Sequence, residues 1–194
     1  MVSPAGPPEA FQQLLRGLAL LSHVYVMGGC AEDALLYGRL TRARADLDLL
    51  VEQDPLRPPS EMLTTAGTAG LQPSIRGPAG EALALETLAC GVRVEVWPAQ
   101  RDTAGLSIVL PGGASGFFRL RLPPDTLDYP MAGLDGVAVP TVSPAALCAF
   151  RAVSAQTRGS EAQRAEDRRV LALLAKTLLP GQALETLSPH IEAL

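Results

Sequence analysis

Apolar residues recur along this chain with two different periods, one typical of helices and one typical of strands. Over residues 9–22 they return every three or four positions, which predicts an amphipathic helix with one face on a core. The same period predicts helices over residues 143–156, 160–176 and 181–193, and a modest helix over 61–69.

Shorter segments are either continuously apolar or alternate between apolar and polar residues, and glycine or proline bounds most of them. Such segments are typical of β-strands. The expected strands cover residues 24–27, 46–51, 71–76, 82–88, 92–97, 106–110, 117–122 and 136–141. The pattern predicts an α/β (α+β) fold, in which helices flank a small mixed β-sheet and further helices extend it at the C-terminal end.

The length of 194 residues suits one core with an extension rather than several domains. Residues 1–8 are rich in proline and glycine and are expected to form a flexible tail. Residues 9–142 would form the core, and residues 143–194 a helical region packed on it. Ser143 is a suitable N-cap for the first of these helices, with Pro144 at its first position.

Composition narrows the range of partners. The net charge is −4 and Lys176 is the only lysine, so broad electrostatic binding of nucleic acid is not expected. No apolar run approaches the length of a membrane span, and the N-terminus lacks the layout of a signal peptide, so we expect a cytoplasmic protein. Three scattered cysteines and two histidines argue against a zinc site or a disulfide framework.

The densest chemistry lies in residues 24–51. A buried strand is followed by Gly28-Gly29 and a short helical segment, and a second strand begins with Asp46-Leu47-Asp48. Alternate side chains of a strand share a face, so the two aspartates point the same way and repel each other unless a cation lies between them. Hard carboxylate oxygens in small number suit Mg²⁺, and a glycine turn into a helix N-terminus suits phosphate.

This stretch resembles the nucleotidyltransferase superfamily that includes DNA polymerase β. In particular it resembles the bacterial aminoglycoside and lincosamide nucleotidyltransferases, where the same motifs occur in the same order. The matching residues are Gly28-Gly29-Cys30-Ala31, Gly38-Arg39, Thr41-Arg42 and Asp46-Leu47-Asp48. The combination is far more specific than Asp-x-Asp alone, which usually marks a strand with two solvated aspartates.

The resemblance implies transfer of a nucleoside monophosphate, AMP from ATP or the equivalent from another NTP, to a hydroxyl of an unidentified small molecule, with release of pyrophosphate. Asp46 and Asp48 would hold Mg²⁺ in a two-metal site. Gly28 and Gly29 would hold the β- and γ-phosphates. The nucleotide would also be contacted by Thr41 and Arg42.

The family carries a third acid on a later strand, usually aspartate. In residues 92–97 alternation places Arg93, Glu95 and Trp97 on one face, so Glu95 is the expected third catalytic and metal-binding residue. It could also orient or deprotonate the acceptor hydroxyl. Two alternatives remain open: Glu95 is an exposed glutamate paired with an arginine, or Glu86 on the preceding strand takes its place.

Two further groups of charged residues are expected to be structural. Arg39 and Arg44 are expected to be solvated, and Glu32 and Asp33 to lie on the helix surface or to pair with arginines.

The C-terminal region resembles the same bacterial proteins less closely. The matching residues would be Ser143-Pro144, Arg151, Arg158, Arg164 and Asp167. Glu166 stands where lysine is common and Val170 where a second aspartate is common. Together with Glu95, these departures leave open a degenerate domain that binds nucleotide or a partner without catalysis. The resemblance also leaves open a toxin-type transferase that modifies tRNA or protein, which the acidic balance and the single lysine make less attractive for tRNA.

Overall fold

The computed structural model describes residues 9–53, 70–77, 80–112, 116–157, 159–182 and 190–194. The predicted tail over 1–8, the predicted helix over 61–69 and Arg158 lie outside the described residues. In the described part, no helix is long and apolar enough to cross a membrane.

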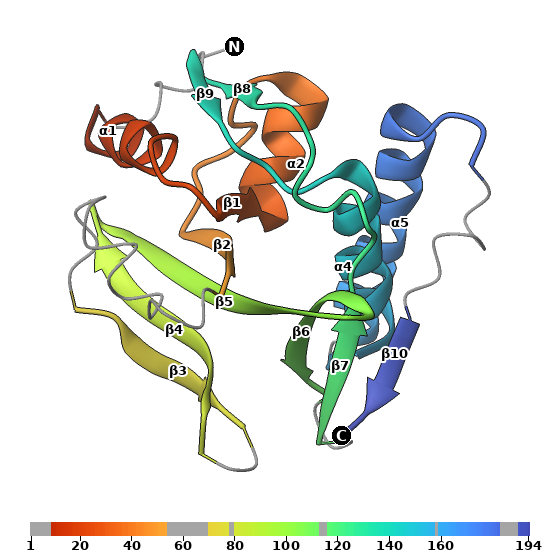
Figure 1. Cartoon of the computed structure of the whole chain (residues 1–194). Coiled ribbons are helices and arrows are strands. Elements are labelled where there is room, and N and C mark those ends of the chain that lie inside the picture. Colours follow the sequence, from red (N-terminus) through yellow and green to blue (C-terminus); the bar gives the residue numbers. More distant parts are fainter. Residues whose placement is uncertain (1–8, 54–69, 78–79, 113–115, 158, 183–189) are drawn as a thin grey trace.

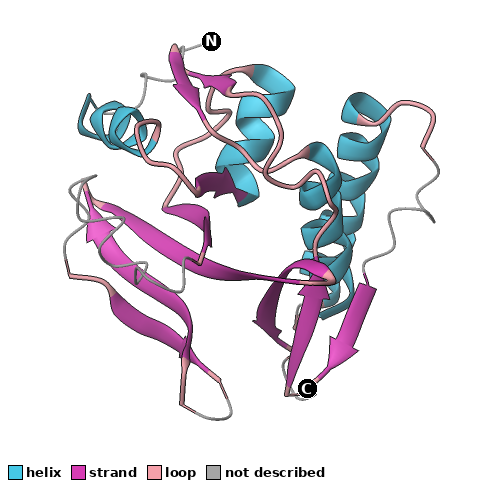
Figure 2. Cartoon of the chain, in the orientation of Figure 1, coloured by secondary structure: helices cyan, strands magenta, loops and turns pink. Residues whose placement is uncertain are grey.

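The helices and strands form an α+β arrangement built on one mixed sheet (Figures 1 and 2). The helices are α1 (Glu9–Leu18), α2 (Gly28–Tyr37), α4 (Pro144–Thr157) and α5 (Glu161–Leu178). The strands are β1 (Val24–Met27), β2 (Asp46–Glu52), β3 (Gln72–Arg76), β4 (Ala82–Ala89), β5 (Val92–Asp102), β6 (Gly105–Pro111), β7 (Phe117–Arg121), β8 (Ala132–Leu134), β9 (Val137–Val139) and β10 (His190–Ala193). The predicted fold class is therefore confirmed.

The long strand β5 connects the two halves of the sheet (Figure 1). Its first part pairs in parallel with β2 and in antiparallel fashion with β4, while its last residues, 100–102, pair with β6. The path β1-β2-β5-β6-β7-β10 runs through the sheet, and β3 is attached through β4. The parallel β2–β5 pair is central for the site, because it brings two acidic segments side by side.

Apolar spacing predicts helix α1, whereas glycines mark both ends of helix α2. The apolar stripe of α1 is buried, as its spacing predicts, although the helix ends at Leu18 rather than at residue 22. Helix α2 begins directly at Gly28, where β1 ends, and stops at Gly38, which adopts the left-handed conformation with φ 67°. The predicted strand–glycine–helix unit is confirmed.

Helix α4 begins as predicted, since the backbone N–H of Ala146 donates to the Ser143 hydroxyl at 3.2 Å and Pro144 is the first helical residue. Its start lies beside β1, because Val142 N–H donates to the Val26 carbonyl at 3.0 Å. Helix α4 packs on both α5 and α2, so the C-terminal helices lie against the glycine-led helix.

The predicted third C-terminal helix over residues 181–193 is wrong in its described part. Residues 181 and 182 belong to a turn, and residues 190–193 form β10, which pairs with β7 in antiparallel fashion. The open edge of β7 offers backbone donors and acceptors to a passing segment, and those long-range hydrogen bonds override the local helical pattern.

Candidate active site

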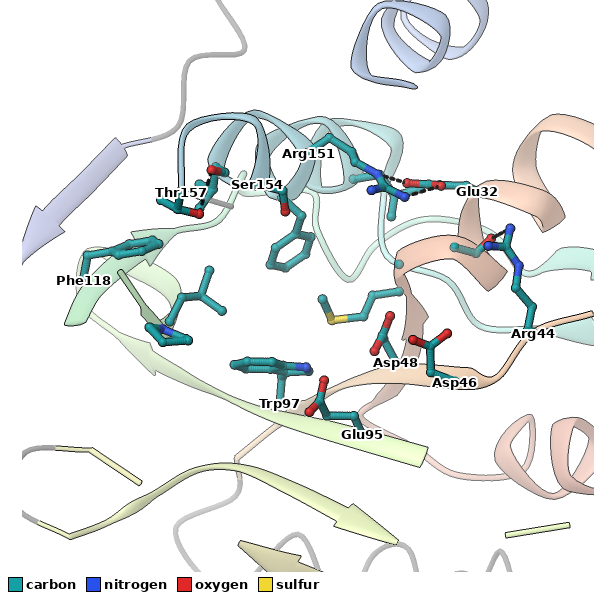
Figure 3. Close-up of a pocket in the computed structure, with 18 of the residues that line it drawn as sticks. Glu32, Arg44, Asp46, Asp48, Glu95, Trp97, Phe118, Arg151, Ser154 and Thr157 are labelled. Carbon is teal, nitrogen blue, oxygen red and sulfur yellow. Dashed lines mark hydrogen bonds and ion pairs between the residues drawn. The ribbon is translucent and has the colours of Figure 1, made fainter. Parts of the chain in front are cut away.

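A cavity of about 450 Å³ opens where β2, β5 and the start of α2 meet the β6–β7 hairpin and α4 (Figure 3). This volume is within the range of small-molecule sites. The residues that line it are Met27, Gly28, Gly29, Glu32, Arg42, Arg44, Asp46, Asp48, Glu95, Trp97, Leu110, Pro111, Phe118, Leu147, Phe150, Arg151, Val153, Ser154 and Thr157.

Strand register brings the three predicted acids to one wall of this cavity. In the parallel β2–β5 pair, Asp48 lies opposite Glu95 and Asp46 lies opposite Arg93. Because partners across a ladder point to the same face, all three carboxylates line the same cavity, as Figure 3 shows. Glu95 is half-buried here, so it is not the exposed glutamate of the first alternative.

The surroundings of Asp48 and Glu95 disfavour the ionised forms of these two carboxyl groups. Burial raises the pKa of Asp48 to about 7, and repulsion from Asp46 and Glu95 adds to the rise, while Arg93 and Arg151 oppose it. Burial also raises the pKa of Glu95, despite the nearby Arg93 and a hydrogen bond from Trp97. The carboxylates therefore form a site that gains from an added cation.

The two glycines are required by close packing as well as by the turn. Gly28 has φ 60°, and a Cβ there would lie 2.2 Å from Asp48 Oδ2. A Cβ on Gly29 would lie 2.3 Å from the Arg44 guanidinium. Each glycine thus leaves space that a charged side chain uses, and the pair lets the N-terminal end of α2 approach the carboxylates. The preceding Met27 makes no side-chain cap to this helix end.

Arg44 is not solvated, so that prediction is wrong, whereas Arg39 is exposed as expected. The Arg44 side chain is 9% exposed, donates to the Asp33 carboxylate at 2.5 Å and donates to the Gly29 carbonyl at 2.8 Å. Burial of Asp33, at 2% exposed, makes this pair necessary, because a buried carboxylate is costly without a partner. The loop before β2 is thereby tied to the start of α2.

The two residues predicted to contact nucleotide lie differently. Arg42 is exposed and lines the cavity. Thr41 instead donates its hydroxyl to Asp33 Oδ1 at 2.7 Å, and Asp33 Oδ2 also accepts from the Thr41 backbone N–H at 3.3 Å. In this structure Thr41 supports the Arg44–Asp33 pair.

A second buried ion pair fixes the helices above the cavity. Arg151 of α4 binds Glu32 of α2 through two hydrogen bonds and donates to Asp167 of α5 at 2.5 Å. Burial alone would lower the pKa of Arg151, but the hydrogen bonds to Glu32 and Asp167 raise it above its usual range. Glu32 and Asp33 are therefore arginine-paired residues, as expected, and are buried rather than on the helix surface.

Glu86 lies next to the predicted site rather than replacing Glu95. It faces Glu95 across the antiparallel β4–β5 pair, and its charge contributes to the raised pKa of Glu95. It is not among the described residues that line the cavity. Of these two glutamates, only Glu95 lines the cavity.

The apolar part of this cavity was not predicted from the sequence. Trp97, Phe118 and Phe150 come from β5, β7 and α4, three elements far apart in the chain. The alternation that put Trp97 on the face of Glu95 was the one available signal. The other two required the tertiary arrangement.

The donor set fits a divalent cation in chemistry, since three carboxylates supply hard oxygen ligands on one wall. Over the described residues, no group of three or more acids, histidines or cysteines is placed where it could hold a metal ion together. Repulsion among Asp46, Asp48 and Glu95 opposes such a cluster unless a cation is present. A Mg²⁺ ion that also takes phosphate oxygens and water needs only a few protein ligands.

Two solved structures are similar to this chain over most of its length. The solution structure of the antibiotic-resistance factor ANT(2'')-Ia has 17% identity and a TM-score of 0.57, covering 92% of this chain and 86% of that chain. The crystal structure of ANT(2'')-Ia in complex with adenylyl-2''-tobramycin has 17% identity and a TM-score of 0.59, covering 84% and 83%. No protein-family model matches the sequence, and the search of curated proteins gave no significant match. At this identity the similarity concerns the fold, and this chain has a nucleotidyltransferase-like fold, as its motifs predicted.

Proposed function

We propose that this protein is a metal-dependent nucleotidyltransferase that transfers AMP from ATP to a hydroxyl of a small molecule and releases pyrophosphate. The observation that carries the proposal is the group of three carboxylates, Asp46, Asp48 and Glu95, on one cavity wall beside the Gly28-Gly29 start of α2. Carboxylates that repel each other next to a helix N-terminus suit a cation and a triphosphate together.

The two halves of this arrangement have separate roles. The backbone N–H groups at Gly28 and Gly29 would donate to the β- and γ-phosphates, where the partial positive charge of the helix end favours anions. Arg42, exposed at the cavity, would add a positive charge to the same phosphates. Thr41 would act through Asp33 and Arg44, which hold the loop in place.

Asp46, Asp48 and Glu95 would hold Mg²⁺, which supplies positive charge against the negative charge that develops on the triphosphate. The acceptor hydroxyl oxygen forms a bond to the α-phosphorus, and the bond from that phosphorus to the bridging oxygen of pyrophosphate breaks. Glu95, on the same cavity wall, would also orient the acceptor hydroxyl and take its proton.

The test is Mg²⁺-dependent release of pyrophosphate and transfer of label from ATP labelled at the α-phosphate, over a panel of hydroxyl compounds. Asp46→Asn should reduce transfer at least a thousandfold, because it removes a ligand charge from the transition state. Asp125→Asn, at an exposed position, is the matched control and should keep full transfer.

A related hypothesis is that the protein binds nucleotide but does not transfer the nucleotidyl group. Mg²⁺-dependent ATP binding with no transfer to any acceptor, water included, would identify a nucleotide-binding domain without turnover. Absence of Mg²⁺-dependent ATP binding would contradict both.

A further inference from the structure

The cavity divides into two sections of opposite character. Most of its charged lining residues come from α2, from the loop before β2, and from β2 and β5, on the right and centre of Figure 3, with Arg151 of α4 above them. On the other side of Trp97, around Phe118, the labelled lining residues carry no charge, and the hydroxyls of Ser154 and Thr157 lie near Phe118. We call this part the apolar section; its residues are Trp97, Leu110, Pro111, Phe118, Phe150 and Val153.

The apolar section is built by three elements in fixed register. Leu110 and Phe118 are direct partners across the β6–β7 hairpin, so their side chains share the face toward the cavity. Phe150 and Val153 of α4 also line the cavity. Trp97 lies beside Glu95. Trp97 and Phe118 are only 9% and 7% exposed, which indicates a well-packed wall rather than loose surface side chains.

The geometry of the reaction decides which molecule meets this wall, and here the inference rests on the proposed function. In phosphoryl-type transfer the attacking and leaving oxygens lie roughly in line through phosphorus. If pyrophosphate lies over Gly28 and Gly29, the attacking hydroxyl must come from the opposite side of the carboxylates. That side is the apolar section, with Glu95 at its inner end.

We propose that the acceptor is an uncharged, hydroxyl-bearing molecule with an aromatic or aliphatic face, and not a polycation such as tobramycin. An ammonium group placed against Leu110, Phe118 or Val153 would lose its water without gaining a carboxylate, which is costly. Apolar surface gains from the same contact. At the margin, the Ser154 hydroxyl offers a hydrogen bond to a polar edge of the ligand. The Thr157 hydroxyl donates to the Val153 carbonyl at 3.0 Å and can accept one from the ligand.

Trp97 makes the proposal directly measurable, because it is the only tryptophan of the chain. Its fluorescence would be followed in the full-length protein during titration with phenyl β-D-glucoside, tobramycin and adenosine, each without nucleotide or metal. Phenyl β-D-glucoside should give a saturable change, and tobramycin and adenosine should not. Saturation by tobramycin at lower concentrations than the glucoside would overturn the proposal, as would adenosine competing for the same signal.

Two variants test the apolar wall, and a third, at an exposed position, is the control. Phe150→Ala should weaken glucoside binding at least fivefold, and Leu88→Ala, at a 75% exposed position on β4, should leave it unchanged. Ser154→Asp places a carboxylate at a half-buried position at the margin of the section and should favour tobramycin over the glucoside. Circular dichroism would show whether the variants are folded. Unchanged ligand binding in folded Phe150→Ala and Ser154→Asp would overturn the proposal.

Calorimetry with ATP and Mg²⁺, run separately, distinguishes this inference from the proposed function. Glucoside binding at Trp97 without Mg²⁺-dependent ATP binding would support the ligand class and reject the transferase. Mg²⁺-dependent ATP binding with tobramycin as the preferred ligand at Trp97 would support the transferase and reject the ligand class.

Discussion

Two groups of carboxylates lie within a short distance of the start of α2, and the protein treats them differently. In the first group each acid has an arginine: Asp33 binds Arg44, while Glu32 and Asp167 share Arg151. These acids are buried, and each receives short charge-assisted hydrogen bonds.

In the second group, Asp46, Asp48 and Glu95 mainly face each other. The nearest cation is Arg93, whose guanidinium is 3.7 Å from Asp46 Oδ2 at an exposed position, where an ion pair contributes little. The pKa of Asp48 is consequently raised to about 7 by burial and by its neighbours.

Under the proposed function, this difference separates acids that hold helices together from acids that bind the cation. Glu32 lines the cavity but shares Arg151 with Asp167. We propose that the charge of Asp46, Asp48 and Glu95 is instead left for a ligand to balance. Perturbed carboxylates in a cleft are typical of functional sites, and the contrast within one small region makes that reading specific here.

The strongest test of the first group is removal of its shared cation. Arg151→Met should lower the free energy of unfolding by about 3–5 kcal/mol, because it leaves buried carboxylates without their partner. Urea denaturation measures this. Arg169→Met, which removes an exposed pair with Glu166 on the same helix as Asp167, should have almost no effect. Equal losses in the two variants would contradict a buried network.

Removal of a charge from the second group should instead raise the free energy of unfolding. The pKa of Asp48 rises from 3.8 to about 7, so its ionised form opposes folding above that pH. Asp48→Asn should therefore raise the free energy of unfolding at pH 8, without divalent cations, by up to about 4 kcal/mol. The difference between wild type and variant should shrink as the pH falls from 7 toward 4. A variant less stable than wild type at pH 8 would mean that Asp48 is a structural acid.

Proton competition gives a third, smaller effect. Below pH 7 a proton on Asp48 must leave before a cation binds, so the Mg²⁺ affinity measured with ATP should fall by up to about tenfold, about 1.4 kcal/mol, per pH unit. Calorimetry at pH 8, 7 and 6 follows this change. A constant affinity over that range would place the cation away from Asp48.

The smallest effect concerns Thr41. Thr41→Val removes one hydrogen bond to Asp33, which keeps its bonds to Arg44, and should cost about 1 kcal/mol of stability. ATP affinity should change less than threefold. A tenfold loss of ATP affinity in a variant of normal stability would instead make Thr41 a direct nucleotide contact.

Local patterns were sufficient for the core of the fold and for the position of the acids. Alternation in residues 92–97 placed Glu95 and Trp97 on one face, and the glycine pair placed the start of α2. The hairpin of β8 and β9 was not predicted as a pair, although Asp135-Gly136, both with positive φ, is a typical two-residue hairpin turn.

Long-range contacts account for the errors. Arg44 was expected to be solvated because nothing nearby in the sequence shows that Asp33 would be buried beneath it. Residues 190–193 were expected to be helical because the free edge of β7 is a property of the assembled sheet. The same holds for the apolar section, whose Phe118 and Phe150 meet only after α4 packs near the β6–β7 hairpin.

The most direct test of the carboxylate group is calorimetric titration of ATP into wild-type protein and Asp48→Asn, each with and without Mg²⁺. We expect wild type to bind ATP at least tenfold more tightly with Mg²⁺ than without it, and the variant to lose that difference. Equal ATP affinity under all four conditions would contradict the assignment of these acids to a cation and its nucleotide.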